Sequence, residues 1–162
     1  MAAIPTIHPC LWFATGIQAA VDYYVRVFPN SRIVGDMDSS EPIPTPAGEP
    51  VVITFELCGA PMMAINGGGT EFPFSEAVSL VLSCDGQDEI DHYWAELTSG
   101  GGEESMCGWL RDRHGLSWQV VPNNVPALLG LGDPEATRRA SAALMQMRKI
   151  DIAAIERARD GG

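Results

Sequence analysis

The sequence predicts an α+β protein that contains two copies of a strand-helix-strands unit followed by a helical extension. Apolar runs at residues 7–13 and 77–84 have the length and density of buried strands. Apolar residues at helical spacing follow each run, and a shift of about 71–73 residues superimposes the two segments. The chain is therefore expected to hold paired βαβββ units within one domain, residues 1–126, and a helical extension at residues 127–162.

The first unit is expected to span about residues 4–70. Thr15 and Gln18 are spaced as a capping box for its helix, which ends before Pro29. One face of this helix carries the apolar residues Ile17, Ala20, Val21, Tyr24 and Phe28. Strands are predicted at 31–37, 51–57 and 62–65, and the proline-rich stretch 38–50 is predicted to be an exposed loop.

The second unit is expected to span about residues 75–122. Asp85 is the predicted cap of a helix whose apolar face consists of Ile90, Tyr93, Trp94 and Leu97. Strands at 105–110 and 116–121 would form a hairpin across the polar turn 111–115, where Trp109 and Trp118 could pair. In the extension, Asp133 and Asp151 are predicted caps of two helices.

Charge and cysteine content limit the possible partners. Ten basic and 21 acidic residues give a formal net charge of −11, which repels nucleic acids and anionic lipid surfaces. Residues 1–110 hold two bases against 15 acids.

The four cysteines, Cys10, Cys58, Cys84 and Cys107, form no Cys-x-x-Cys pair and are expected to be reduced and mostly buried. With no long apolar run and no export signal, a cytoplasmic location is predicted.

Several short strings are more specific than the repeat. They are Leu11-Trp12-Phe13, YVRVFPNSRI at 24–33, GGEESMCGWL at 101–110, GLSWQVVP at 115–122 and MQMRKIDIAA at 145–154. Together they resemble the PhnB-like family, often labelled 3-demethylubiquinone-9 3-methyltransferase, of the vicinal-oxygen-chelate superfamily. The resemblance runs from about residue 4 to residue 158. It implies a glyoxalase-like fold in which each unit curls into a half-barrel, and it implies a homodimer.

The resemblance also implies where a metal would be held. In that superfamily two histidines and one or two glutamates hold a divalent ion on the concave face, and the matching positions here are His8, Asn66, Ser79 and Gln119. One imidazole, one hydroxyl and two amides compensate little of the desolvation of a cation. The usual metal site is therefore expected to be missing, and no cofactor is predicted.

Strand alternation divides the remaining candidates between two faces. His8, Cys10 and Trp12 share one face of the first strand. In the second unit, Ser79, Val81 and Ser83 are expected on the cavity face, opposite the helix-facing residues Val78, Leu80, Leu82 and Cys84. A cavity with these groups suits a small, partly hydrophobic molecule. His8 is the candidate anchor or proton carrier, and the candidate ligand contacts are Cys10, Trp12, Asn66, Ser79 and Gln119.

Three function classes follow from these residues. The leading hypothesis is small-molecule binding, with enzymatic activity left open. The alternative is a metal-dependent lyase, isomerase or dioxygenase of the glyoxalase type, in which His8 acts with an acid such as Glu56 or Glu103. The third is the methyltransferase of the family label. Its usual cofactor turn, a glycine-rich link from strand to helix, is missing, because the glycine runs at 67–69 and 100–102 are both predicted turns.

Overall fold

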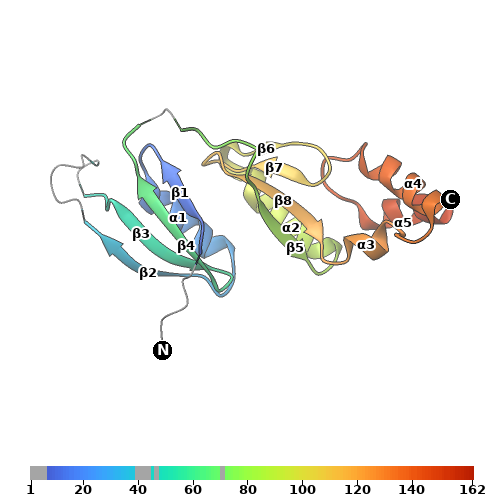
Figure 1. The fold of residues 1–162 in the computed structure, drawn as a ribbon, viewed down its shortest axis with the longest axis horizontal. Coiled ribbons are helices and arrows are strands. Elements are labelled where there is room, and N and C mark those ends of the chain that lie inside the picture. The colour runs from blue at the N-terminus through green and yellow to red at the C-terminus, as the bar shows by residue number, and fades with distance from the viewer. Residues whose placement is uncertain (1–6, 39–44, 46–47, 70–71) are drawn as a thin grey trace. The chain divides into compact units, whose positions relative to one another are not determined.

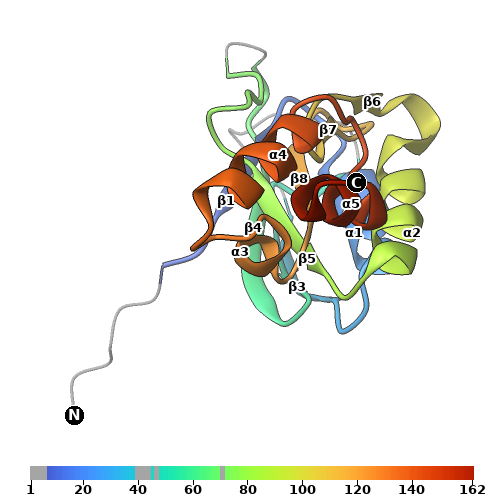
Figure 2. The same cartoon turned by 90° about the vertical axis from the view of Figure 1, so that its right-hand side faces the viewer.

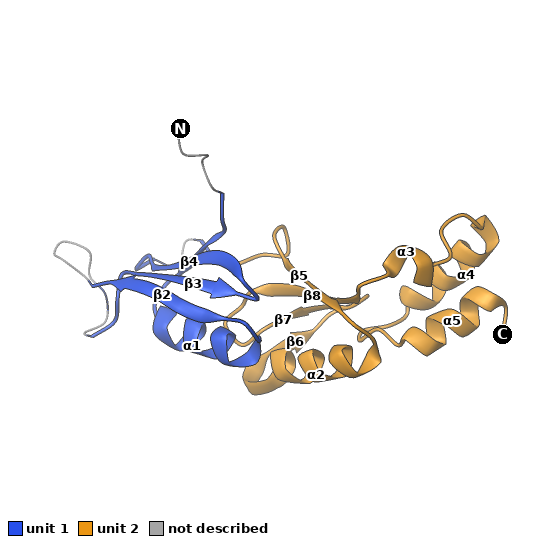
Figure 3. Cartoon of the chain, turned by 90° about the horizontal axis from the view of Figure 1, so that it is seen from below, with its two compact units in different colours: residues 1–73 blue, residues 74–162 orange. Residues whose placement is uncertain are grey.

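A computed structural model describes residues 7–38, 45, 48–69 and 72–162. The chain divides into two compact units, residues 1–73 and 74–162 (Figure 3). Both units begin with a strand, a helix and then three strands, so the predicted paired βαβββ architecture is confirmed. None of the described helices is long and apolar enough to cross a membrane.

Unit 1 forms a four-stranded sheet with one helix on it (Figure 1). Its elements are β1 (Cys10–Phe13), α1 (Ile17–Val27), β2 (Arg32–Met37), β3 (Val52–Leu57) and β4 (Ala60–Asn66). The strand order is β1-β4-β3-β2, with β1 parallel to β4 and the other pairs antiparallel. Alternate residues of β1, β3 and β4 are buried on the helix side, since a sheet covered on one face needs apolar groups only there.

The first strand is shorter than the sequence predicts. Ile7 and His8 are exposed and lie before β1, which begins at Cys10. Pro9 accounts for this difference, because proline has no N–H to donate to a ladder. Its carbonyl still accepts a hydrogen bond of 3.0 Å from the Met63 N–H, so strand pairing starts directly after it.

Helix α1 is not started by the predicted capping box. Its N-cap is Gly16, with φ 83° and no capping side chain of its own. The exposed N–H groups are instead met by residues from elsewhere in unit 1. The Glu49 carboxylate accepts from the Gly16 N–H at 2.9 Å, and the Asn66 amide oxygen accepts from the Ile17 N–H at 3.3 Å. A carboxylate at this position also interacts favourably with the helix dipole.

Unit 2 repeats the sheet-and-helix arrangement. Its elements are β5 (Leu80–Cys84), α2 (Gln87–Thr98), the 3-10 turn η1 (Ser99–Gly101), β6 (Glu103–Glu104), β7 (Trp109–Arg111) and β8 (Ser117–Pro122). The strand order is β5-β8-β7-β6, with β5 parallel to β8. Ile90, Trp94 and Leu97 of α2 are buried as predicted. Asp85 is not the cap, since Gly86 takes that position with φ 98°.

The predicted strand at 105–110 is wrong in extent. A turn occupies 106–108, where Cys107 and Gly108 both have positive φ, of 59° and 84°. The strands lie on either side of it, as β6 and β7. The predicted pair of tryptophans is also wrong. Trp109 is opposite Gln119, whereas Trp118 is opposite Leu110, so the two indoles lie on different faces of the sheet.

The hairpin between β7 and β8 is built around Asp112, which is 3% exposed. Its carboxylate accepts three hydrogen bonds, from the His114 N–H at 2.8 Å, the Leu116 N–H at 3.1 Å and the Trp118 indole N–H at 2.8 Å. A buried carboxylate needs such donors, because its charge is expensive to remove from water. Asp112 therefore fixes both the turn and the position of Trp118.

Three helices form the extension, and all belong to unit 2. They are α3 (Val125–Leu128), α4 (Pro134–Leu144) and α5 (Ile152–Asp160), with α5 in contact with both others (Figure 2). Here the sequence caps are confirmed. Asp133 accepts from the N–H groups of Glu135 and Ala136, and Asp151 accepts from that of Ala154. Local caps suffice because each acid lies directly before its own helix.

The segment between α4 and α5 is fastened to the sheet and to α2. The N–H groups of Cys107 and Gly108 donate to the carbonyls of Met147 and Arg148, both at 2.7 Å. The Gln87 amide donates to the Ile150 carbonyl and accepts from the Ile152 N–H, at 3.0 and 2.9 Å. A Cβ at position 108 would lie 2.8 Å from the Val120 carbonyl oxygen, and φ at this position is 84°, so glycine is needed at this close approach.

Asp112→Asn is expected to lower the free energy of unfolding by about 1–3 kcal/mol, because its new amide group would meet the Trp118 indole N–H donor to donor. Urea denaturation followed by tryptophan fluorescence measures this loss. Asp36→Asn, at an exposed position of β2, is the matched control and should stay within about 0.5 kcal/mol of the wild type. Equal stability of both variants would contradict the role given to Asp112.

Burial lowers the pKa of His114, the nearby Arg113 adds to this, and Asp112 opposes it. The unfolded chain then binds a proton more readily than the folded one, so stability falls as the pH drops below about 6.5. We expect His114→Gln to reduce the difference in unfolding free energy between about pH 7 and pH 5. An unchanged difference in His114→Gln would contradict the assignment.

Candidate functional site

Within the described residues, each sheet has one face covered by its helix and one face on which no helix lies, which we call the open face (Figure 3). In unit 1 the open face carries the residues that alternate with the buried ones. They are Cys10, Trp12, Met37, Val52, Thr54, Glu56, Met63 and Ile65. The predicted placement of Cys10 and Trp12 on one face of β1 is confirmed.

A hollow of about 420 Å³ lies on the open face of unit 1. It is lined by Gly35, Asp36, Met37, Val52, Thr54 and Met63. Thr54 uses its hydroxyl to donate to the Gly35 carbonyl at 3.1 Å, which leaves mostly apolar groups toward the hollow. Met37 is 56% exposed and adds apolar surface to the lining of the hollow.

Trp12 lies at the end of the same face, in contact with Phe72 and Gly67. The Trp12 and Phe72 rings meet edge to face, with centroids 5.5 Å apart. A Cβ at position 67 would lie 1.9 Å from the indole, so Gly67 provides the space in which the ring packs. The glycine run at 67–69 is predicted to be a turn, and the structure agrees. The run follows β4, and no helix begins within it.

Two of the predicted site residues of unit 1 are placed differently from the prediction. His8 lies outside the strand and is exposed, instead of inside a buried strand. Asn66 is 2% exposed and points to the helix side of β4. Its amide donates to the Glu49 carboxylate and to the Pro50 carbonyl, at 3.0 and 2.9 Å, in addition to its bond with α1. Asn66 thus holds a helix end in place.

The open face of unit 2 brings two predicted residues together. The Gln119 amide donates to the Ser79 hydroxyl at 2.9 Å. Val81 and Ser83 are exposed beside them, as strand alternation predicts, while Cys84 is buried on the helix side. Val78 departs from the prediction: it precedes β5 and is 72% exposed.

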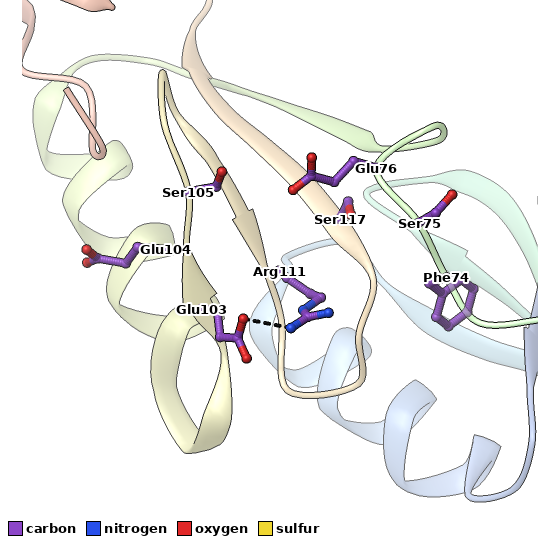
Figure 4. A pocket seen from close by; sticks show the side chains of 8 residues that line it. All are labelled: Phe74, Ser75, Glu76, Glu103, Glu104, Ser105, Arg111 and Ser117. Atoms are coloured by element: carbon purple, nitrogen blue, oxygen red, sulfur yellow. Dashed lines mark hydrogen bonds and ion pairs between the residues drawn. The ribbon is translucent and has the colours of Figure 1, made fainter. Parts of the chain in front are cut away.

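A polar pocket of about 260 Å³ also lies in unit 2 (Figure 4). Its lining residues are Phe74, Ser75, Glu76, Glu103, Glu104, Ser105, Arg111 and Ser117. Arg111 and Glu103 form an ion pair of 2.6 Å across β6 and β7. Glu104 accepts from the Trp94 indole at 2.8 Å, which confirms that the two adjacent glutamates point to opposite faces.

This pocket is not predicted from the sequence. Arg111 and Ser117 are register partners and share the face of Gln119, so alternation along β7 and β8 could have located them. Glu76 lies in the segment before β5, where no sequence period identifies it.

The cysteines were expected to be mostly buried, and for two of them this prediction is wrong. Cys10 and Cys58 are exposed. Cys84 is buried, and burial raises the pKa of its thiol to about 11.

The residues at the implied metal positions do not fit a divalent cation. Asn66 is committed to α1, and Gln119 donates its amide to Ser79. The two acids considered as helpers, Glu56 and Glu103, are paired with Arg32 and Arg111. In the part of the chain that the structure describes, no three His, Cys, Asp or Glu side chains form a group that could hold a metal ion.

Comparison with known proteins matches this arrangement. The family model for 3-demethylubiquinone-9 3-methyltransferase matches residues 5–121. The PhnB protein from Bacillus cereus is 29% identical, with a TM-score of 0.66 over 73% of this chain and 98% of its own. Protein PA1353 from Pseudomonas aeruginosa is 19% identical, with a TM-score of 0.58 over 74% of this chain and 97% of its own.

The fosfomycin resistance protein FosX from Listeria monocytogenes, whose structure contains Mn(II) and sulfate, shares the fold at 10% identity. Its TM-score is 0.53, over 77% of this chain and 94% of FosX. No curated protein matches the sequence. Because the family model covers most of the chain and the paired βαβββ fold agrees with it, this protein belongs to the 3-demethylubiquinone-9 3-methyltransferase (PhnB-like) family.

Proposed function

We propose that this protein binds a small, partly hydrophobic organic molecule on the open faces of its sheets. The hollow of about 420 Å³ in unit 1 carries the proposal. Its volume falls within the range of about 300–1,000 Å³ that is typical of sites for small organic ligands. Burial of Met37, Val52 and Met63 against an apolar group would contribute about 25 cal/mol for each Å² removed from water.

The remaining candidate contacts complete the proposal. Cys10 and Trp12 share the open face that holds the hollow, and Ser79 and Gln119 are paired on the open face of unit 2. Because the implied ligand positions do not fit a divalent ion, the proposed binding needs no metal. The resemblance to the vicinal-oxygen-chelate superfamily implies a homodimer, and we propose this assembly.

The elements that flank the two glycine runs favour small-molecule binding over methyl transfer. One run follows β4 and packs against Trp12, and the other lies in and beside η1, between α2 and β6. A cofactor turn of the doubly wound type instead leads from a strand directly into a helix. The one described glycine that leads from β1 into α1, Gly16, has its N–H bonded to Glu49.

Val52→Trp tests the hollow by filling it. Nile red, an uncharged apolar fluorophore, is the probe, and its affinity should fall roughly ten-fold in this variant because the added ring occupies its space. The control is Val34→Trp, on the exposed part of β2 outside the hollow lining, which should keep the wild-type affinity. Circular dichroism verifies folding. Equal Nile red affinity in all three proteins would overturn the site.

Native mass spectrometry of the purified chain tests the metal-free homodimer. The expected spectrum is a dimer without stoichiometric metal, with a co-purified organic molecule as further support. A monomer at micromolar concentration would contradict the dimer. Stoichiometric divalent metal that disappears in His8→Ala would overturn metal-free binding in favour of the glyoxalase-type alternative.

A further inference from the structure

Three polar residues are buried in the described part of the chain: Asn66, Asp112 and Ser117. The first two have complete structural roles, since Asn66 bonds to α1 and its flanking loop and Asp112 holds the hairpin. Ser117 is different. It is 2% exposed, and no hydrogen bond of its hydroxyl is present within the described residues. The hydroxyl is open to the pocket that Ser117 lines, so it can accept a hydrogen bond from a molecule bound there.

The Ser117 hydroxyl faces the polar pocket of unit 2 (Figure 4). Glu76 lines the same pocket, and no hydrogen bond or ion pair of its carboxylate is present within the described residues. The charge of Glu103 is compensated by Arg111 at 2.6 Å. Glu104 is directed to the Trp94 indole and to Arg148, at 2.8 and 3.8 Å. Within the described residues, the pocket therefore contains one uncompensated negative charge and one hydroxyl that can accept a hydrogen bond from a ligand.

We propose that this pocket binds the protonated amine of a small organic compound, with Glu76 as the counter-charge and the Ser117 hydroxyl as a hydrogen-bond acceptor. A single ammonium group would compensate the charge of Glu76. Its N–H groups would donate hydrogen bonds to the Glu76 carboxylate and to the Ser117 hydroxyl. The Glu103 carboxylate adds a second negative group at the same pocket while keeping its bond to Arg111.

Two further features favour a cation that carries an apolar body. Phe74 provides an aromatic wall, and aromatic faces attract ammonium groups. The net charge of the whole chain, −11, also attracts cations over a distance and repels anions. The volume of about 260 Å³ suits a compound of one ring and a short amine arm.

Benzylamine is the probe for this pocket, with benzyl alcohol and benzoate as neutral and anionic probes of nearly the same shape. Titration of the full chain is followed by backbone amide shifts in NMR. We expect benzylamine to shift the amides of Glu76, Ser105 and Ser117 with an affinity at least roughly ten-fold above that of benzyl alcohol, and benzoate not to bind. Added salt should weaken benzylamine binding.

Two substitutions test the individual contacts. Glu76→Gln keeps the shape and removes the charge, so benzylamine affinity should fall roughly ten-fold. Ser117→Ala removes the acceptor and should weaken binding by roughly three- to ten-fold. Glu156→Gln, on the exposed face of α5, makes the same change in net charge outside the pocket and should leave the affinity within about two-fold of the wild type.

Three results would overturn the amine pocket. Equal affinity for benzylamine and benzyl alcohol would remove the role of charge. Preference for benzoate would show that Arg111, and not Glu76, dominates recognition. Equal weakening in Glu76→Gln and Glu156→Gln would reduce the effect to net charge. None of these depends on the hollow of unit 1, so the amine pocket and the Val52→Trp test can fail separately.

Discussion

The buried carboxylate of Asp112 sets the geometry on which the open face of unit 2 depends. Its three hydrogen bonds hold the turn between β7 and β8 and fix which residues face each other across the hairpin. In that register Arg111 lies opposite Ser117, on the open face. A slip of one residue would turn every side chain of β8 to the other face, with Trp118 exposed and Gln119 against α2. The Asp112 carboxylate thus stabilises the hairpin and also determines which side chains of β8 lie on the open face.

Helices α1 and α2 begin in a different way from α4 and α5, which are capped by the side chains of Asp133 and Asp151. Gly16 and Gly86, with φ 83° and 98°, allow the chain to turn sharply from a strand into a helix that packs on the same sheet. Neither glycine has a side chain to cap with. For α1 the missing acceptors come from Glu49 and Asn66, which are distant in sequence. The N-terminal end of α1 is therefore held in place only when β4 and the segment that carries Glu49 have folded against it.

This difference explains how much of the fold could be predicted from the sequence. Asp133 and Asp151 were found because a local cap lies next to the helix that it serves. The capping box at Thr15 was wrong, since a tertiary acceptor replaced it. The order of strands and helices was correct because the apolar spacing of strands and helices differs, and because two matching copies support each other.

The site was predicted less completely, for reasons that lie in particular residues. Alternation correctly placed Trp12 and Gln119 on open faces, but His8 lies outside the strand because Pro9 ends the ladder. Asn66 took part in the helix start, a role that only the folded chain reveals. Glu76 lies outside any regular element, so no period marks it. Binding groups on connecting segments are commonly missed for this reason.

Ser117 connects the stability of the fold with its proposed function. Its side chain is 2% exposed and lines the polar pocket, so its hydroxyl is directed at whatever occupies that pocket. Val120, on the opposite face of β8, is buried with no polar side-chain atom. Sites that break a local rule of stability are commonly functional. A ligand whose ammonium N–H donates to the Ser117 hydroxyl would form a charge-assisted hydrogen bond there, so the register that Asp112 fixes would also supply a binding contact.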